Sequence, residues 1–126
     1  MRDCRGNFSI EFAILFPLFL LLAIGIFDIG MVVVEKMKLE FATEAAAKLF
    51  VTPDKGVCRT PAATADYAAG LLGISPSNFS VATPCGGQPG GSVTGTYTYM
   101  PIILPSTIDL VASACYPTTA TTPPCP

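Results

Sequence analysis

The sequence predicts an α+β fold: a long N-terminal membrane-spanning α-helix that continues into a small domain with a second helix and a three-stranded antiparallel sheet. Three observations lead to this prediction. Residues 12–34 form an apolar run with a single charge, and a helical pattern continues beyond it to about residue 50. Three short segments with strand-like alternation follow, separated by stretches rich in glycine and proline.

The composition is more apolar than that of an ordinary soluble domain. Of the 126 residues, 51% are hydrophobic and 13% are charged, whereas charged residues make up about 25% of a typical soluble domain. The length allows one domain plus an additional element. The few charged residues after position 50 form no basic patch, so nucleic-acid binding is not expected.

The apolar run is long enough to cross a bilayer. At about 1.5 Å of rise per residue, residues 12–34 reach across a hydrocarbon core of roughly 30 Å. We therefore expect residues 7–34 to form a transmembrane helix, as the first part of one helix from about Phe8 to Phe50.

Two residues interrupt the apolar run. Pro17 predicts a kink or a locally unwound turn, because proline removes one backbone hydrogen bond; a proline without a structural role is the alternative. The single charge, Asp28, is expected near the outer membrane interface, where water reaches it. The alternative for Asp28 is a specific contact with another component of an assembly.

Residues 35–52 are expected to be an amphipathic continuation of the same helix. An apolar face that packs on the small domain is predicted by residues that recur every four positions: Met37, Phe41, Ala45 and Leu49. Pro53 follows too closely for the helix to continue much farther.

Residues 53–116 are expected to form the small α+β domain. Thr60 can cap a second helix that begins at Pro61 and ends at Gly70 or Gly73. Alternating patterns predict three strands, at 77–83, 92–100 and 107–116.

Two further segments of this region are not expected to be regular. The apolar segment MPIILPS, between the last two strands, is predicted to be a loop that turns its isoleucines inward. Residues 117–126 are a tail rich in threonine and proline, which should be extended because it cannot form a ladder.

The four cysteines after the apolar run predict that this part of the chain is exported. Two disulfides are expected among Cys58, Cys85, Cys115 and Cys125, with three possible pairings. We favour Cys58 with Cys85 and Cys115 with Cys125, although sequence alone does not determine connectivity. Four unrelated buried thiols are the alternative.

The sequence does not predict catalysis or a cofactor. The chain has no histidine and no Cys-x-x-Cys pair, so neither a zinc site nor a histidine base is expected. The acids after position 50 are scattered and have no visible nucleophile beside them: Asp54, Asp66 and Asp109.

A carboxylate near the start of the apolar run needs an explanation. Glu11 is the fifth residue after Gly6, and an aromatic residue and a long apolar helix follow it. This pattern resembles the processing site of type IV pilin precursors, which are cut after the glycine. Cleavage would expose an amine on Asn7, one helical turn from Glu11, and the carboxylate could pair with the amine of a neighbouring subunit. A glutamate at the headgroup boundary and a cleaved secretory signal are the alternatives.

The segment RGNFSIEFAILFPLFLLLAIGIFDIG, with FATEAAAKLF after it, resembles the TadE-like family of pseudopilins from the tight-adherence (Flp-type) type IV pilus system. The resemblance covers about residues 5–50. The matching positions are Gly6, Glu11, Phe12, Ala13, Pro17, Asp28, Gly30 and Ala45 to Lys48. The family more often has glutamate where Asp28 stands. Phe12, where major Flp pilins usually have tyrosine, favours a minor pseudopilin.

The resemblance implies a minor pseudopilin that takes part in pilus assembly and surface adhesion. Residues 1–6 would be a leader that a prepilin peptidase removes between Gly6 and Asn7, and Glu11, Phe12 and Asp28 would act in assembly. The implied location is the bacterial inner membrane, crossed once, with a cytoplasmic N-terminus and an extracytoplasmic domain, and then the pilus. The implied partners are the peptidase, other pilins or pseudopilins, the inner-membrane assembly platform and membrane lipid. The alternative is a non-polymerising, membrane-anchored envelope protein with a small partner-binding domain.

Overall fold

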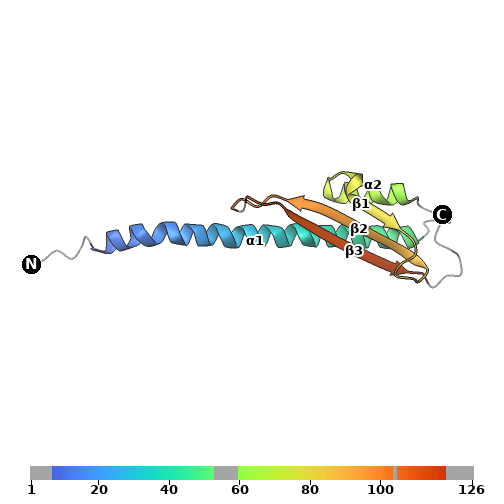
Figure 1. Cartoon of the computed structure of the whole chain (residues 1–126), viewed down its shortest axis with the longest axis horizontal. Coiled ribbons are helices and arrows are strands. Elements are labelled where there is room, and N and C mark those ends of the chain that lie inside the picture. The colour runs from blue at the N-terminus through green and yellow to red at the C-terminus, as the bar shows by residue number, and fades with distance from the viewer. Residues whose placement is uncertain (1–6, 53–59, 104, 119–126) are drawn as a thin grey trace, which may run out of the picture.

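The computed structural model describes residues 7–52, 60–103 and 105–118. Figure 1 shows one long helix with a sheet and a second helix gathered along its C-terminal half. In chain order the elements are α1 (Asn7–Val51), α2 (Pro61–Leu72), the 3₁₀ turn η2 (Pro76–Asn78), β1 (Phe79–Ala82), β2 (Gly90–Tyr99) and β3 (Ile108–Pro117). The predicted α+β class, second helix and three-stranded antiparallel sheet are confirmed.

The helix α1 is 45 residues long and continues through Pro17 without interruption. No residue around Pro17 leaves the helix, so the predicted unwound turn is wrong; a kink at this position stays a prediction. An 18-residue window of α1 has a mean hydropathy of 2.6, and none of it is buried by the rest of the chain. The helix is long and apolar enough to span a membrane.

The helix α2 begins and ends at capping residues that the sequence indicates. The Thr60 hydroxyl accepts a hydrogen bond from the Ala63 backbone N–H at 3.3 Å, and Pro61 occupies the first turn. At the other end, Gly73 adopts a left-handed conformation with φ of 68°, and its N–H donates to the Ala69 carbonyl. The helix therefore ends at Gly73 and passes through Gly70.

The sheet has the order β1-β2-β3, and both pairs are antiparallel. The register places Phe79 opposite Gly95 and Tyr97 opposite Leu110. Along β2 and β3 every second residue faces the helices, as the alternation predicts. The inward residues that are buried are Gly91, Val93, Gly95, Leu110 and Ala112.

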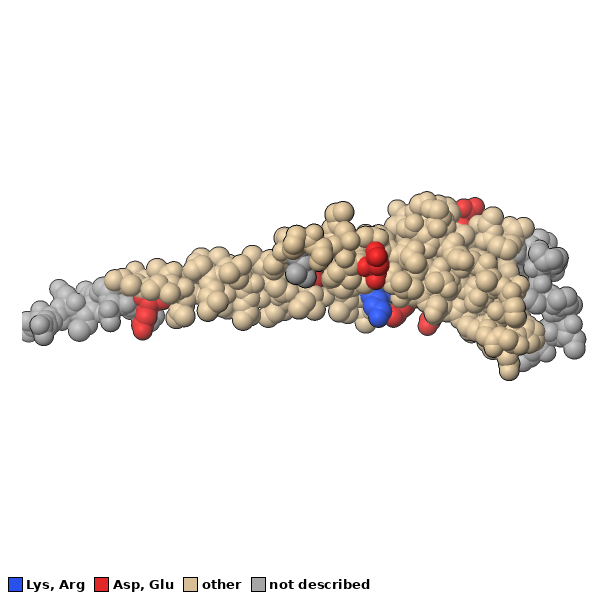
Figure 2. Space-filling model, in the orientation of Figure 1, with Lys and Arg blue, Asp and Glu red and all other residues tan. Residues whose placement is uncertain are grey.

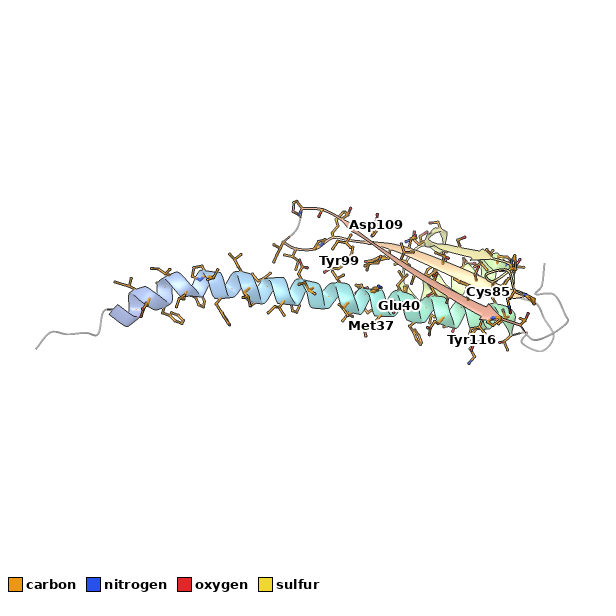
Figure 3. The ribbon with its side chains drawn as sticks, turned by 60° about the horizontal axis from the view of Figure 1, so that its bottom comes forward. Met37, Glu40, Cys85, Tyr99, Asp109 and Tyr116 are labelled. Atoms are coloured by element: carbon orange, nitrogen blue, oxygen red, sulfur yellow. A yellow bond between two sulfur atoms is a disulfide. The ribbon has the colours of Figure 1, made fainter. Side chains whose placement is uncertain are left out.

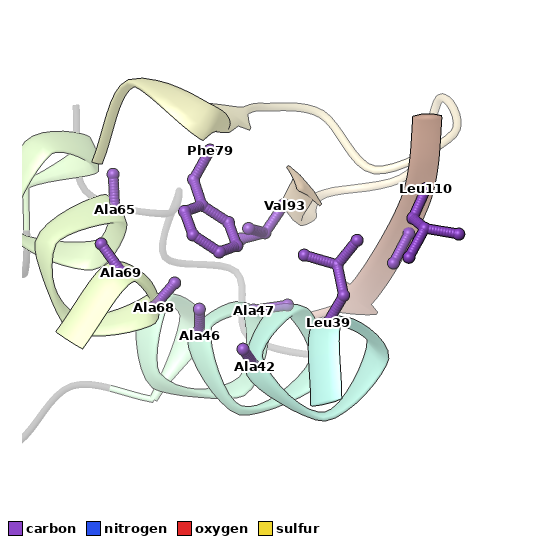
Figure 4. Packing of buried hydrophobic residues seen from close by; sticks show 11 residues of the cluster. Leu39, Ala42, Ala46, Ala47, Ala65, Ala68, Ala69, Phe79, Val93 and Leu110 are labelled. Carbon is purple, nitrogen blue, oxygen red and sulfur yellow. The ribbon is translucent and has the colours of Figure 1, made fainter. Parts of the chain in front are cut away.

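The core lies between the C-terminal half of α1, the helix α2 and one face of the sheet (Figure 4). Its helical members are mostly alanines: Ala42, Ala46, Ala47, Ala65, Ala68 and Ala69. Small side chains let two helices and a sheet approach closely, and Gly95 shows how closely. A Cβ atom added there would lie 2.8 Å from Phe79 and 3.0 Å from Leu39.

The face of α1 that packs on the domain differs from the predicted one. Met37 and Phe41 are 63% and 66% exposed, and Figure 3 shows Met37 on the side of α1 away from the sheet. The buried face consists of Leu39, Ala42, Thr43, Ala46, Ala47 and Phe50. Of the other two predicted residues, Ala45 and Leu49 are half-buried. The prediction was therefore wrong for Met37 and Phe41, because it weighed hydrophobicity, whereas close packing against the sheet and α2 favours small side chains at several positions of this face.

Candidate functional site

The N-terminal half of α1 carries the predicted assembly residues. Glu11 is the fifth residue of α1 when Asn7 is counted as the first, and it is exposed. Phe12 is 59% exposed, and its ring centroid lies 5.6 Å from that of Phe16. Gly6 lies outside the described residues, and the side chain of Asn7 is not described.

Around Glu11 the helix surface is continuously apolar. Every residue from 9 to 22 is exposed, and Figure 2 shows this half of the rod as an almost uniformly uncharged surface. A surface of this size, made of leucine, isoleucine and phenylalanine, is unfavourable in water. It suits contact with lipid or with other apolar helices, and the Glu11 carboxylate lies within it.

The second carboxylate in the apolar run, Asp28, lies in a different environment. It is 4% exposed. Its oxygens accept hydrogen bonds from the Ile102 backbone N–H at 3.2 and 3.0 Å and from the Ile103 backbone N–H at 3.2 Å. The Tyr99 hydroxyl donates to Oδ1 at 3.4 Å. Both oxygens of the buried carboxylate therefore have hydrogen-bond donors within the same chain.

The expectation that water reaches Asp28 is therefore wrong. The chain folds back from β2, so that residues 74 and 75 positions farther along cover the carboxylate. Since its oxygens have partners within the same chain, a role of Asp28 in assembly stays a prediction. These donors could not be predicted, because nearly every residue has a backbone N–H and its identity does not show which amide meets Asp28. The apolar, proline-bounded loop MPIILPS was the one sequence feature that could have indicated a segment covering α1.

Tyr99 is linked to Asp28 electrostatically as well as by its hydrogen bond. Partial burial, together with the neighbouring Asp28 carboxylate, raises the pKa of Tyr99 above its ordinary value of 10.0. Tyr99 therefore stays neutral over the physiological range, and its hydroxyl remains available as a donor to the Asp28 carboxylate.

A disulfide joins Cys85 to Cys115, with 5.6 Å between the two Cα atoms. This corrects the favoured pairing, in which Cys85 joined Cys58 and Cys115 joined Cys125. Cys58 and Cys125 themselves lie outside the described residues. The observed disulfide ties the connection between β1 and β2 to the end of β3.

The turn that contains Cys85 accounts for this pairing. Gly86 and Gly87 both have positive φ, and Cys85 exchanges two backbone hydrogen bonds of 3.0 Å with Gln88. The tight turn leaves Cys85 close to the start of β2, where the register places Cys115 opposite Ser92. Tertiary pairing therefore selects Cys115 as the partner of Cys85.

Residues 6–48 match the family model described as TadE-like protein. This match confirms the family resemblance inferred from the sequence. It covers about a third of the chain and includes Gly6, Glu11, Pro17 and Asp28. Comparisons with curated proteins and with solved structures found no match to the chain.

Proposed function

We propose that this chain, whose residues 6–48 match the TadE-like family, is a minor pseudopilin of a tight-adherence (Flp-type) pilus. A prepilin peptidase cuts between Gly6 and Asn7. The product is held in the bacterial inner membrane by α1, with the sheet domain outside the cytoplasm. It then joins other pilins or pseudopilins at the assembly platform and contributes to pilus assembly and surface adhesion, with no catalysis of its own.

One observation carries the proposal: half of a 45-residue helix projects beyond its own domain and keeps its apolar surface exposed. A soluble domain gains nothing from such a projection, because exposed leucine and phenylalanine surface is costly in water. A filament subunit gains a segment that lipid covers before assembly and that neighbouring helices cover afterwards. The position of Glu11 in this segment supports contact with neighbouring helices after assembly.

The carboxylate of Glu11 restricts the axial position of one subunit relative to its neighbour. Inside a bundle of apolar helices an unpaired charge is heavily penalised, while a paired charge is tolerated. The amine that cleavage creates on Asn7 is the nearest group of opposite charge in a neighbouring subunit at about the same depth. Pairing of Glu11 with that amine neutralises both charges and favours one axial position.

Replacing Glu11 tests the assembly role. We expect Glu11→Ala to leave membrane insertion intact and to lower the amount of the protein in sheared pili by roughly tenfold, because the partner amine would remain unpaired. Immunoblots of membrane and pilus fractions measure both quantities. Glu44→Ala is the matched control, since Glu44 is an exposed acid on the same helix outside the apolar run. Equal recovery of the Glu11 and Glu44 variants in pili would contradict the proposal.

The N-terminus of the mature protein tests the processing step. Mass spectrometry of the protein purified from membranes should find Asn7 as the first residue. If Met1 or Arg2 is retained in a working protein, the non-polymerising envelope anchor is the better explanation, since the proposed partner of Glu11 would not form.

A further inference from the structure

The loop between β2 and β3 extends beyond the sheet. In Figure 1 it runs along α1 toward the N-terminus, past the end of the other domain elements. We call residues 100–103 of this loop, all of which the structure describes, the hairpin tip. The tip lies on α1 around Asp28, which binds its backbone.

The side chains of residues 100–103 are apolar, and three of the four are exposed. Met100 is 76% exposed, Ile102 is 73% exposed and Ile103 is 47% exposed. The isoleucines were expected to turn inward, and this expectation is wrong for Ile102, whereas Ile103 is only half exposed and its side chain lies against α1 near Gly25. Asp28 binds their backbone N–H groups, so the loop lies with its amides toward α1 and leaves much of its side-chain surface outward.

The hairpin tip lies beside the apolar run and away from the charged part of α1. Gly25 and Ile103 line one shallow pocket together with Ile29, and a Cβ atom on Gly25 would lie 4.0 Å from Ile103 Cδ1. After Asp28 the next charged residue of α1 is Glu35. Gly25 precedes Glu35 by ten residues, which is about 15 Å of helix. The hairpin tip therefore lies beside a part of α1 whose other faces are apolar.

Two backbone N–H groups of the hairpin tip have hydrogen-bond partners that do not depend on water. Irregular backbone is unstable in hydrocarbon unless its N–H groups have partners within the protein. Asp28 supplies that partner for two consecutive amides, of Ile102 and Ile103. The same hydrogen bonds stabilise a carboxylate that would otherwise be costly at this depth. The carboxylate and the two amides therefore each lower the free-energy cost of burying the other.

From this geometry we propose that the hairpin tip enters the outer surface of the phospholipid bilayer beside α1, with Asp28 as the residue that holds it there. The domain then has two contacts with lipid, α1 and the tip. This inference rests on α1 spanning a membrane, and it does not depend on pilus assembly. Lipid is the occupant because the exposed surface of the tip is continuous with the apolar surface of α1.

Tryptophan fluorescence can test this in the full chain, because the protein contains no tryptophan of its own. The probe variant is Ile102→Trp, reconstituted into phosphatidylcholine vesicles whose acyl chains carry bromine near the headgroup. We expect a shift of its emission to shorter wavelengths and a loss of intensity relative to vesicles without bromine. Met100→Trp repeats the measurement at a second exposed position, in case the first variant is poorly folded.

Two further single-tryptophan variants separate the possible outcomes. Leu21→Trp reports the apolar half of α1 and should be quenched by bromine deep in the acyl chains. Tyr116→Trp, an aromatic exchange at the far end of β3, should not be quenched. If Leu21→Trp is quenched while Ile102→Trp and Met100→Trp behave like Tyr116→Trp, the inference is wrong and the membrane anchor stands. If Leu21→Trp is not quenched either, both the anchor and the inference fail. Quenching of Tyr116→Trp would mean that lipid also contacts the far end of the sheet, and the inference of a lipid contact specific to the hairpin tip would then be wrong.

Discussion

The two halves of α1 belong to one uninterrupted helix and follow opposite packing rules. From residue 9 to 22 every side chain is exposed, and most are large, whereas half of the buried positions between 39 and 50 are alanines. The first half presents its side chains to surroundings that are fluid or variable in shape. A larger apolar side chain can bury more area there without a clash. The second half must fit between a sheet and α2, where bulk is excluded. Hydrophobicity alone therefore identifies the exposed apolar half and misidentifies part of the domain-facing side of the other half.

The same substitution in each half gives the largest expected contrast. We expect Leu39→Ala to lower the free energy of unfolding of the domain by about 2–5 kcal/mol, because it leaves a cavity in a close-packed core. Leu39 is 1% exposed, whereas Leu21 is 62% exposed, so Leu21→Ala should leave the domain stability nearly unchanged. Thermal or chemical denaturation in detergent micelles, followed by near-ultraviolet circular dichroism, measures both. Equal effects would mean that the halves do not differ in packing.

Asp28 lies where the two halves of α1 meet, and its removal should loosen the hold of α1 on the hairpin tip. We expect Asp28→Ala to cost about 1–3 kcal/mol, because the amides of Ile102 and Ile103 lose their acceptor. Hydrogen exchange at these two amides should become faster in detergent micelles. Asp66→Ala, at an exposed acid of α2, is the control and should leave both amides unchanged. Unchanged exchange in the Asp28 variant would contradict the observed contact.

The smallest expected effect is a dependence on alkaline pH. The pKa of Tyr99 is raised above 10.0 in the folded protein, so its contribution to stability is complete below that pH and is lost as the pH rises through the folded pKa. The reason is that a phenolate beside the Asp28 carboxylate would be repelled. Denaturation at pH 8 and at about pH 11 should therefore show a larger loss for the wild-type protein than for Tyr99→Phe. Parallel losses in both proteins would exclude this linkage.

Much of the fold could be predicted because its determinants are local. The length of α1 follows from an apolar run and a proline at its end, and α2 begins at Thr60 and Pro61 as capping chemistry requires. The strands follow from alternation, and their observed bounds differ by a few residues from the predicted ones. In the candidate site, the position of Glu11 was predictable because it depends only on spacing within one helix.

The remaining features depend on contacts between distant segments. Cys85 and Cys115 are 30 residues apart, and Asp28 meets amides more than 70 residues away. Such pairs depend on strand register and on the direction in which a loop folds back, neither of which a local pattern encodes. The choice between Met37 and Leu39 as a core residue depends likewise on how closely the sheet approaches α1.

The amino-acid sequence by itself therefore determined the long apolar helix, its early carboxylate and the class of the domain, because propensity, spacing and hydrophobic length act within single segments. Only the tertiary structure decided that Asp28 is buried, that Cys85 joins Cys115 and that Ile102 of the hairpin tip faces outward. The physical reason is that hydrogen-bond acceptors and close-packed surfaces are satisfied by whichever groups the folded chain brings near, whatever their distance along it.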